Sequence, residues 1–270
     1  MEDDRKKITG LYDESFEKDS CGFGLIANID NNPSHWLINT AITALERLAH
    51  RGAVGADGTS GDGCGILFKI PEFFFRSIAN EEKINIAKNF AIGMFFLNVD
   101  ANKRKSSIKI IEKVISESGF SLAGWRDVPT DKSICGEDAL KTLPYIAQAF
   151  INPPEKLDAK DIESRLFVIR RKIEILVSKE KDETFYITSF SSKVILYKGM
   201  IMPKHLSKFY LDLSNEKLET SLCVFHQRFS TNTTPQWSLA QPFRMLAHNG
   251  EINTIRGNRN WSQARSSIFK

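Results

Sequence analysis

The residue with the clearest chemical potential is Cys21, which follows a polar leader and opens the apolar, glycine-rich run CGFGLIANI. If the chain is cut between Ser20 and Cys21, the cysteine gains a free α-amino group with a reference pKa of ~7.7–8.0. That amine can accept the thiol proton at neutral pH, directly or through water, so one residue supplies nucleophile and base. Gly22 lets the backbone approach a substrate closely. The structural alternative is a cysteine that simply begins a strand.

A second polar group follows an apolar run, in the sequence HQRFSTNT. Arg228 stands at the end of a predicted strand, and its planar guanidinium suits bidentate binding of a carboxylate. Thr231 and Asn232 follow it and are further candidates for substrate binding. The alternative for Arg228 is an ordinary surface residue or ion pair.

A third polar group lies in the run AHNGEINTIRGNRNW. The side-chain amide of Asn249 and the backbone N–H of Gly250 can together stabilise a developing oxyanion. Glu251 adds a carboxylate beside them and is a further substrate-binding candidate. Asn–Gly is also a common turn dipeptide, so a hairpin turn followed by a capped helix is the alternative.

The remaining motifs carry weaker chemical signals. The stretch GADGTSGDGCG at 55–65 lacks the Gly-Lys-Ser/Thr ending of a phosphate loop, so we interpret it as a structural loop near the site. The other cysteines, Cys64, Cys135 and Cys223, are widely spaced and are interpreted as small buried hydrophobes. The histidines also lack the spacing of metal ligands, so the sequence predicts no metal site.

The pattern of apolar residues predicts the elements that must position these groups. Residues 1–20 are polar and without periodicity, which indicates a detachable leader. A helix should begin after Ser34 as N-cap, run to about Ala49 and end at Gly52. Pro71 should start another helical region, and an amphipathic helix is expected at 103–118. Strands are expected at 22–29, 65–70, 91–99, 121–125, 145–151 and 221–230.

Two further segments complete the prediction. The stretch 165–178 is interpreted as a strand entering a helix. The stretches 184–190 and 193–199 are interpreted as a hairpin joined at Ser191–Ser192. Strands and helices come in runs rather than in strict alternation, which favours a layered α+β fold.

Composition limits the classes of function. The 270 residues suffice for one large or two small domains, with 41% hydrophobic and 26% charged residues. The net charge of +4 is scattered, so no nucleic-acid or membrane partner is expected. No apolar run approaches the ~18 residues of a membrane helix, and the N-terminus lacks the apolar core of a secretory signal. We therefore expect a cytoplasmic protein; a plastid location is the alternative, although no transit peptide is seen.

Taken together and in order, the motifs resemble those of the class II glutamine amidotransferases, and within them the glutamate synthases. The runs that carry the resemblance span Cys21 to Trp261: CGFGLIANI, LERLAHRGAVGADGTSGDGCGIL, SSKVILYKGM, HQRFSTNT and AHNGEINTIRGNRNW. The resemblance implies a four-layer αββα N-terminal nucleophile (Ntn) hydrolase fold. It also implies a cleavable propeptide at 1–20, a type-2 glutamine amidotransferase domain at 21–270, and self-removal of the leader.

The resemblance also implies roles for particular residues. Cys21 matches the nucleophile that hydrolyses L-glutamine to glutamate and ammonia, Arg228 matches the arginine that holds the glutamine α-carboxylate, and Asn249 with Gly250 matches the oxyanion hole. In the family the ammonia passes through a tunnel to 2-oxoglutarate and forms a second glutamate. FMN and a 3Fe–4S cluster belong to later synthase domains, so no cofactor is expected in this chain. The electron donor is ferredoxin in plant-type enzymes, whereas bacterial NADPH types pair with a small flavoprotein subunit.

The sequence leaves several alternatives open. The family's glutaminase domain continues past Lys270 to an aspartate that binds the glutamine α-amino group, so we expect a domain incomplete at its C-terminus, with an exposed sheet edge and weak turnover alone. One alternative is another class II amidotransferase, such as asparagine synthetase, glucosamine-phosphate synthase or the purine-pathway enzyme. Those enzymes typically expose the cysteine directly after Met1 and lack the HRGA and GEINTIRGN runs. The other alternative is a non-catalytic module, which predicts an uncleaved leader and an unlabelled Cys21.

Overall fold

Two four-stranded antiparallel sheets form the centre of the molecule. The computed structural model describes residues 22–228, 233–244 and 256–266. The first sheet has the order β1-β8-β2-β7 and the second the order β4-β5-β3-β6. The strands of the first sheet are β1 (Phe23–Ala27), β2 (Cys64–Lys69), β7 (Val194–Gly199) and β8 (Leu222–Gln227). Those of the second are β3 (Ala91–Leu97), β4 (Ser121–Asp127), β5 (Tyr145–Asn152) and β6 (Tyr186–Ser191).

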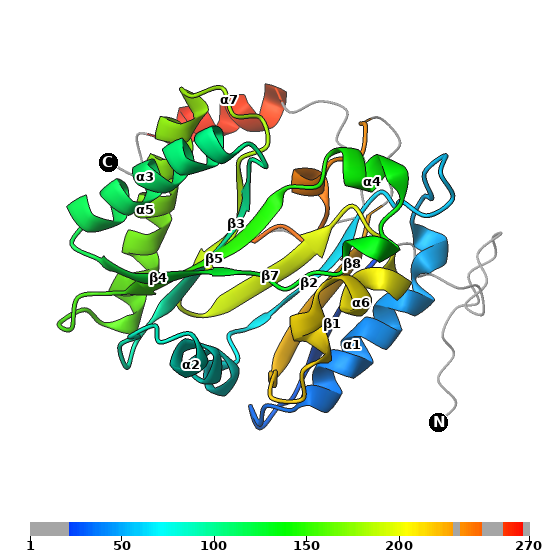
Figure 1. Cartoon of the computed structure of the whole chain (residues 1–270), viewed down its shortest axis with the longest axis horizontal. Coiled ribbons are helices and arrows are strands. Elements are labelled where there is room, and N and C mark those ends of the chain that lie inside the picture. Colours follow the sequence, from blue (N-terminus) through cyan, green and yellow to red (C-terminus); the bar gives the residue numbers. More distant parts are fainter. Residues whose placement is uncertain (1–21, 229–232, 245–255, 267–270) are drawn as a thin grey trace, which may run out of the picture.

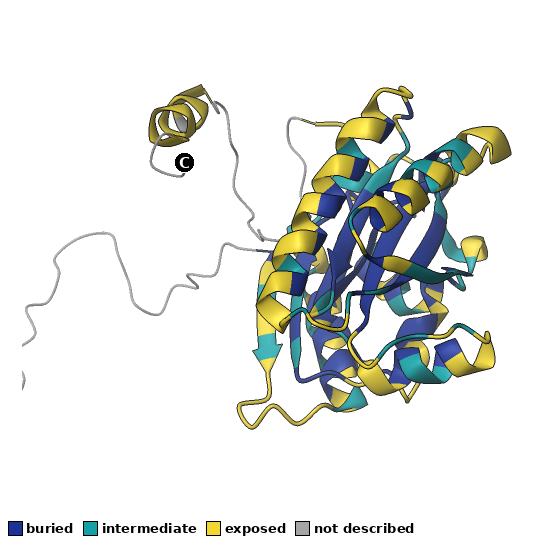
Figure 2. Cartoon of the chain, turned by 90° about the vertical axis from the view of Figure 1, so that its left-hand side faces the viewer, coloured by how far each residue is buried: buried dark blue, intermediate teal, exposed yellow. Residues whose placement is uncertain are grey.

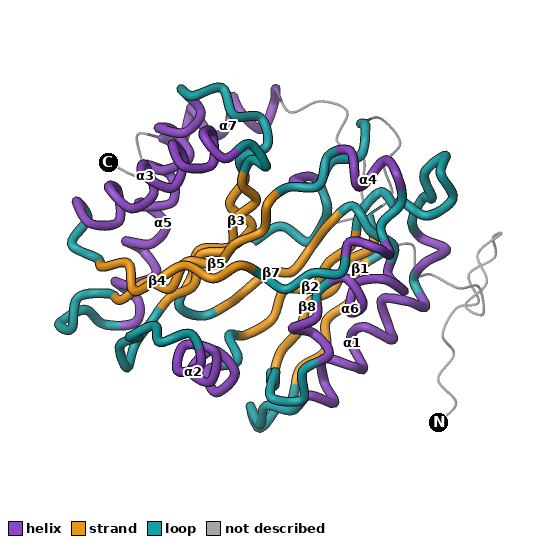
Figure 3. The backbone as a smooth tube through the Cα atoms, in the orientation of Figure 1, coloured by secondary structure: helices purple, strands orange, loops and turns teal. Residues whose placement is uncertain are grey.

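Helices lie outside the two sheets (Figures 1 and 3). Helices α3 and α5 pack on each other and against the second sheet, whereas α1 packs on β8 and β1 of the first. The described elements therefore form helix, sheet, sheet and helix layers, which confirms the predicted α+β class. The helices are α1 (His35–Arg47), α2 (Glu72–Glu81), α3 (Ala101–Glu117), α4 (Glu137–Lys141), α5 (Ala159–Ser178), α6 (Leu206–Phe209) and α7 (Arg256–Arg265).

Strand β3 shows how one strand contributes to two cores. Successive side chains of a strand point to opposite faces, and every residue of β3 is buried. Ile92, Met94 and Phe96 join a core that includes residues of α1, α2 and the first sheet. The alternate side chains of β3 join a second core with α3 and α5. Figure 2 shows the resulting buried strands behind helices with an exposed outer face.

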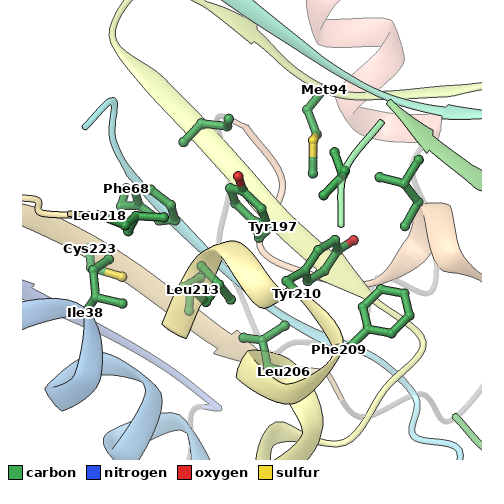
Figure 4. Packing of buried hydrophobic residues seen from close by; sticks show 14 of the residues in the cluster. Ile38, Phe68, Met94, Tyr197, Leu206, Phe209, Tyr210, Leu213, Leu218 and Cys223 are labelled. Carbon is green, nitrogen blue, oxygen red and sulfur yellow. The ribbon is translucent and has the colours of Figure 1, made fainter. Parts of the chain in front are cut away.

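Aromatic side chains fill much of the larger core (Figure 4). Tyr197 of β7 stacks on Phe68 of β2 with ring centroids 5.6 Å apart. Tyr210 meets Tyr197 edge-on at 5.0 Å and Phe209 edge-on at 4.7 Å. Such edge-on pairs are favourable beyond their buried area, so this cluster ties α6 to the first sheet.

Most predicted elements are confirmed by the structure. Helix α1 begins after Ser34, whose Oγ accepts from the backbone N–H of Leu37 at 3.3 Å. Helix α2 follows Pro71 directly. The helix predicted at 103–118 and the strands predicted at 65–70, 91–99, 121–125 and 145–151 are present with small shifts of their ends. The strand predicted at 221–230 is present as β8, and residues 229–230 lie outside the described residues.

Three expectations at the level of elements are wrong. Residues 165–178 are entirely helical within α5, because Asp158 caps the helix and buried residues recur every three or four positions. Strands β6 and β7 are joined at 192–193 and not at Ser191–Ser192, because Ser191 ends β6, and they form no hairpin: β6 pairs with β3 and β7 pairs with β2, so they belong to different sheets. Strand β1 was predicted to be buried, yet Leu25 is 59% exposed, because β1 is the edge strand and one face lacks cover among the described residues.

Candidate functional site

The site begins where β1 and β8 meet. The strands are antiparallel, and Phe23 lies opposite His226. One step further along this ladder, the backbone N–H of Gln227 donates to the carbonyl of Gly22 at 2.6 Å. In the sequence, Gly22 follows Cys21 and Gln227 precedes Arg228. The pairing therefore joins the immediate neighbours of two predicted site residues.

Arg228 is held from three directions. Its side chain is 8% exposed, and its two terminal nitrogens donate to the carbonyl of Asp62 at 3.2 Å and to Thr233 Oγ1 at 2.6 Å. Its backbone N–H donates to the carbonyl of Gly63 at 2.9 Å. Burial lowers the pKa of Arg228 from its usual value, and the nearby charge of Asp62 opposes that shift. An arginine stays protonated at neutral pH, so the structure presents a fixed, partly desolvated cation.

The glycine-rich stretch at 55–65 supplies two of these contacts, through the carbonyls of Asp62 and Gly63. The Asp57 carboxylate accepts from the backbone N–H groups of Thr59 at 3.0 Å, Ser60 at 2.7 Å and Asp138 at 3.0 Å, and from the Ser60 hydroxyl. These hydrogen bonds, led by that of the Ser60 hydroxyl, hold the pKa of Asp57 well below its usual range. The loop is thereby tied to the start of α4. The contacts of Asp62 and Gly63 place this loop against Arg228, and its predicted role as a structural loop near the site stays a prediction.

The segment that follows Thr233 packs on β7 and on α4. Trp237 donates from Nε1 to the carbonyl of Ala139 at 3.0 Å. Its ring packs so closely on Gly199 that a Cβ added to this glycine would come within 2.4 Å of a ring carbon. Lys198 of β7 is fully buried and donates from Nζ to the carbonyls of Ser238 and Ala240. One signal in the sequence marks Lys198, a charged residue inside an apolar strand. Lys198 is not among the predicted site residues.

The other cysteines are poor nucleophiles. Cys64 and Cys223 are 0% exposed and lie in the larger core. Burial raises the pKa of both thiols far above the usual value. Cys135 is half-buried, and burial with the charge of Asp131 raises its pKa to about 11. Since the thiolate is the nucleophile, none of these three is suited to attack a substrate at neutral pH.

The structure reaches only one of the predicted site residues, Arg228. The others lie outside the described residues: Cys21, Thr231, Asn232, Asn249, Gly250 and Glu251. In the described ranges, no group of three or more His, Cys, Asp or Glu side chains could hold a metal ion. The described residues therefore do not fit an iron–sulfur cluster, which is held by a group of cysteine thiolates.

A layered α+β fold with a buried arginine at the end of the strand beside β1 is compatible with an amidotransferase, and comparison with known families settles the class. The chain belongs to the class II glutamine amidotransferases: the family model described as "Glutamine amidotransferases class-II" matches residues 21–270. The chain is therefore a member of an enzyme family with the Ntn hydrolase fold.

Individual relatives narrow the resemblance to glutamate synthases. The chain is 42% identical over 269 residues to ferredoxin-dependent glutamate synthase 1, chloroplastic/mitochondrial, of Arabidopsis thaliana, across 98% of this chain and 17% of that protein. It is 42% identical over 258 residues to the glutamate synthase (NADPH) large chain of Azospirillum brasilense, across 95% of this chain and 17% of that protein. The predicted resemblance to glutamate synthases is confirmed. The chain spans about a sixth of the length of these curated relatives.

The relatives differ in cellular location. Some are named chloroplastic, such as the ferredoxin-dependent glutamate synthase of Oryza sativa subsp. japonica. Across the part of the chain that the structure describes, no helix has the length and apolar character needed to cross a membrane. A cytoplasmic location therefore stays a prediction.

Proposed function

We propose that residues 21–270 belong to the glutaminase unit of a glutamate synthase, with Cys21 as its nucleophile. The observation that carries the proposal is the hydrogen bond between Gly22 and Gln227, the sequence neighbours of Cys21 and Arg228. Neighbouring strands lie ~4.8 Å apart, so this pairing favours a nucleophile and a carboxylate anchor at one end of β1 and β8. The raised pKa values of the other three thiols also favour Cys21 as the reactive cysteine.

In the proposed mechanism, removal of residues 1–20 exposes the α-amino group of Cys21. L-Glutamine binds with its α-carboxylate against the guanidinium of Arg228. Charge-assisted, bidentate hydrogen bonds of this kind are stronger than neutral ones. The side-chain amide of glutamine is then directed toward Cys21. Thr231, Asn232 and Glu251 are proposed to line the remainder of the glutamine site.

Acyl transfer then proceeds in two stages. The α-amine of Cys21 accepts the thiol proton, and the sulfur attacks the amide carbon, forming a C–S bond. The amide oxygen becomes an oxyanion, which the Asn249 side chain and the Gly250 N–H stabilise. The C–N bond breaks, and ammonia leaves with the proton held by the amine. Water then hydrolyses the thioester, which gives glutamate and restores the thiol.

In a complete glutamate synthase we propose that the ammonia is passed to 2-oxoglutarate in synthase domains beyond this chain. FMN and an iron–sulfur cluster in those domains would supply the reducing electrons. The electron donor would be ferredoxin, or NADPH through a small flavoprotein subunit.

The proposal is tested by intact mass after treatment with 6-diazo-5-oxo-L-norleucine, a reactive glutamine analogue. We expect loss of residues 1–20 and one adduct, mapped to Cys21 by peptide sequencing. The Cys21→Ser variant should take up no adduct, and the Cys135→Ser variant should label like the wild type. A full-length mass without an adduct would support a non-catalytic module, and an adduct on another cysteine would refute the assignment of the nucleophile.

A further inference from the structure

Lys198 is a buried cation beside the candidate site, on strand β7. Its side chain is 0% exposed, and its Nζ donates to the carbonyls of Ser238 at 2.7 Å and Ala240 at 2.8 Å. A third, longer contact reaches the Tyr186 hydroxyl at 3.4 Å. The ammonium also lies 4.4 Å from the ring centre of Tyr186 and 4.8 Å from that of Phe243. Among the described residues, the partners of the Lys198 ammonium are therefore oxygen atoms of uncharged groups and the faces of two aromatic rings, and none is a carboxylate.

A continuous set of contacts leads from Lys198 to Arg228. Ala240, whose carbonyl Lys198 holds, packs directly on the backbone of Gly63: a Cβ added to Gly63 would come within 2.7 Å of the Ala240 Cβ. The carbonyl of Gly63 accepts the backbone N–H of Arg228 at 2.9 Å. Gly65 of β2 lies opposite Lys198 of β7, and its lack of a side chain makes room for the lysine: a Cβ at Gly65 would lie 2.5 Å from the Lys198 Cβ. Lys198 is therefore connected to Arg228 by direct contacts through Ala240 and Gly63.

Burying this charge has a free-energy cost that an apolar side chain at the same position would avoid. An ammonium without an anionic partner in a dry interior is unfavourable. Burial, followed by the nearby Arg244 and Arg228, lowers the pKa of Lys198 well below its usual value. The advantage of a lysine here is that one nitrogen carries three hydrogen-bond donors. They can bind the carbonyls of Ser238 and Ala240, which belong to a segment that forms no strand.

We propose that Lys198 is a positioning residue for glutamine binding, which acts by fixing Ala240 against Gly63 and thereby the backbone of Arg228. The inference rests on the proposed role of Arg228 as the carboxylate anchor. Without the ammonium, the carbonyls of Ser238 and Ala240 lose their shared donor, and the segment can lift from Gly63. Arg228 then keeps its charge and its hydrogen-bond donors, but its backbone is no longer held in one position. The affinity for glutamine therefore falls, while the reactivity of Cys21 is unchanged.

The test compares Lys198→Met with Arg228→Lys and with Arg126→Met, which removes a buried cation from a separate network. For each folded variant, the rate of labelling by the glutamine analogue is measured against its concentration. Lys198→Met is expected to raise the half-saturating concentration about tenfold or more, with the maximal rate within about threefold of the wild type. Arg126→Met is expected to lower stability and leave the half-saturating concentration unchanged.

Amide hydrogen exchange supplies a readout that does not depend on glutamine. Lys198→Met should speed exchange selectively in peptides that contain Arg228, whereas a general loss of stability would speed it throughout the chain. If Lys198→Met does not fold, Lys198→Gln, which keeps a shorter neutral donor, is measured in the same way. An unchanged half-saturating concentration, or unchanged exchange at Arg228, overturns the inference. If Arg228→Lys leaves the half-saturating concentration unchanged, or the wild type does not bind the analogue, the proposed function fails, and the role of Lys198 in it fails too.

Discussion

A buried ion pair joins Arg126 of β4 to Asp212 in the 3-10 helix Leu211–Ser214. The two side chains are 7% and 4% exposed, and the guanidinium binds both carboxylate oxygens, at 2.7 and 2.8 Å. Gln148 of β5 accepts from Arg126 at 2.8 Å, and the Tyr197 hydroxyl of β7 donates to Asp212 at 2.8 Å. Glu82 adds a longer ion pair with Arg126 at 3.3 Å. Loss of Asp212 thus leaves a buried cation without its bidentate partner.

The substitution Asp212→Ala probes this ion pair. Removing one member of a buried, hydrogen-bonded ion pair costs ~3–5 kcal/mol, because the remaining charge is left in a poorly solvated place. Glu82 and Gln148 stay in contact with Arg126, so we expect a value near the lower end, about 3 kcal/mol. Replacing both members by apolar residues, Arg126→Met with Asp212→Leu, should cost less than Asp212→Ala alone, because no charge is then buried.

Stability is measured by urea unfolding followed by tryptophan fluorescence, with the slope m checked for each variant. Glu117→Ala serves as control: its ion pair with Lys113 joins side chains that are 63% and 71% exposed, so its loss should barely change the unfolding midpoint. A loss below about 1 kcal/mol in Asp212→Ala would contradict this expectation, since it would mean that the pair is solvated. A double variant less stable than Asp212→Ala would contradict it as well.

Three further predictions concern the loop and the thiols. Gly63→Ala should destabilise the chain by about 1–3 kcal/mol in thermal unfolding, since Gly63 has φ of +115° and its Cβ would meet Ala240 at 2.7 Å. Asp57→Asn should be less stable than the wild type at neutral pH, because the variant lacks the carboxylate that accepts the loop's hydrogen bonds. The pKa of Asp57 is lower in the folded than in the unfolded protein, so the carboxylate stabilises the fold above the unfolded pKa and loses this effect as it protonates. The difference in stability between the two proteins should therefore shrink as the pH falls below about 4. In the native protein, alkylation of Cys135 by iodoacetamide should rise about tenfold per pH unit up to a pKa of about 11, whereas Cys64 should react only on unfolding; equal rates for the two would contradict their burial.

Local signals in the sequence predicted the elements well where the chain itself contains the determinant. Ser34 caps α1 and Pro71 precedes α2, and both are properties of short segments. The stretch 165–178 was misread because its β-branched residues resemble a strand, although the buried positions follow a helical period. The pairing of β6 and β7 with different sheets depends on β3 and β2, which lie about 90 to 130 residues earlier, so no local pattern contains it.

The same contrast holds for the site. Arg228 was identified from its residue type and its place after a strand. Of the groups that hold it, Thr233 follows only five residues later, but the carbonyl of Asp62 lies 166 residues earlier in the sequence. Lys198 was missed because its partners Ser238 and Ala240 follow 40 and 42 residues later and contribute only backbone oxygens. A backbone acceptor leaves no mark in the sequence, so contacts of this kind emerge only from the fold.

The function proposed for the site depends on Arg228 binding the α-carboxylate of a glutamine whose side chain reaches Cys21. A competition experiment compares L-glutamine with L-glutamine α-amide, which lacks the carboxylate, as protectants of Cys21 against the reactive analogue. In the wild type, glutamine should protect at a concentration ~10–100 times lower, since a hydrogen bond to a charged group contributes ~1.5–3 kcal/mol. In Arg228→Lys that preference should shrink about tenfold. Equal protection by both compounds in the wild type, or an unchanged preference in the variant, would contradict the proposed role of Arg228.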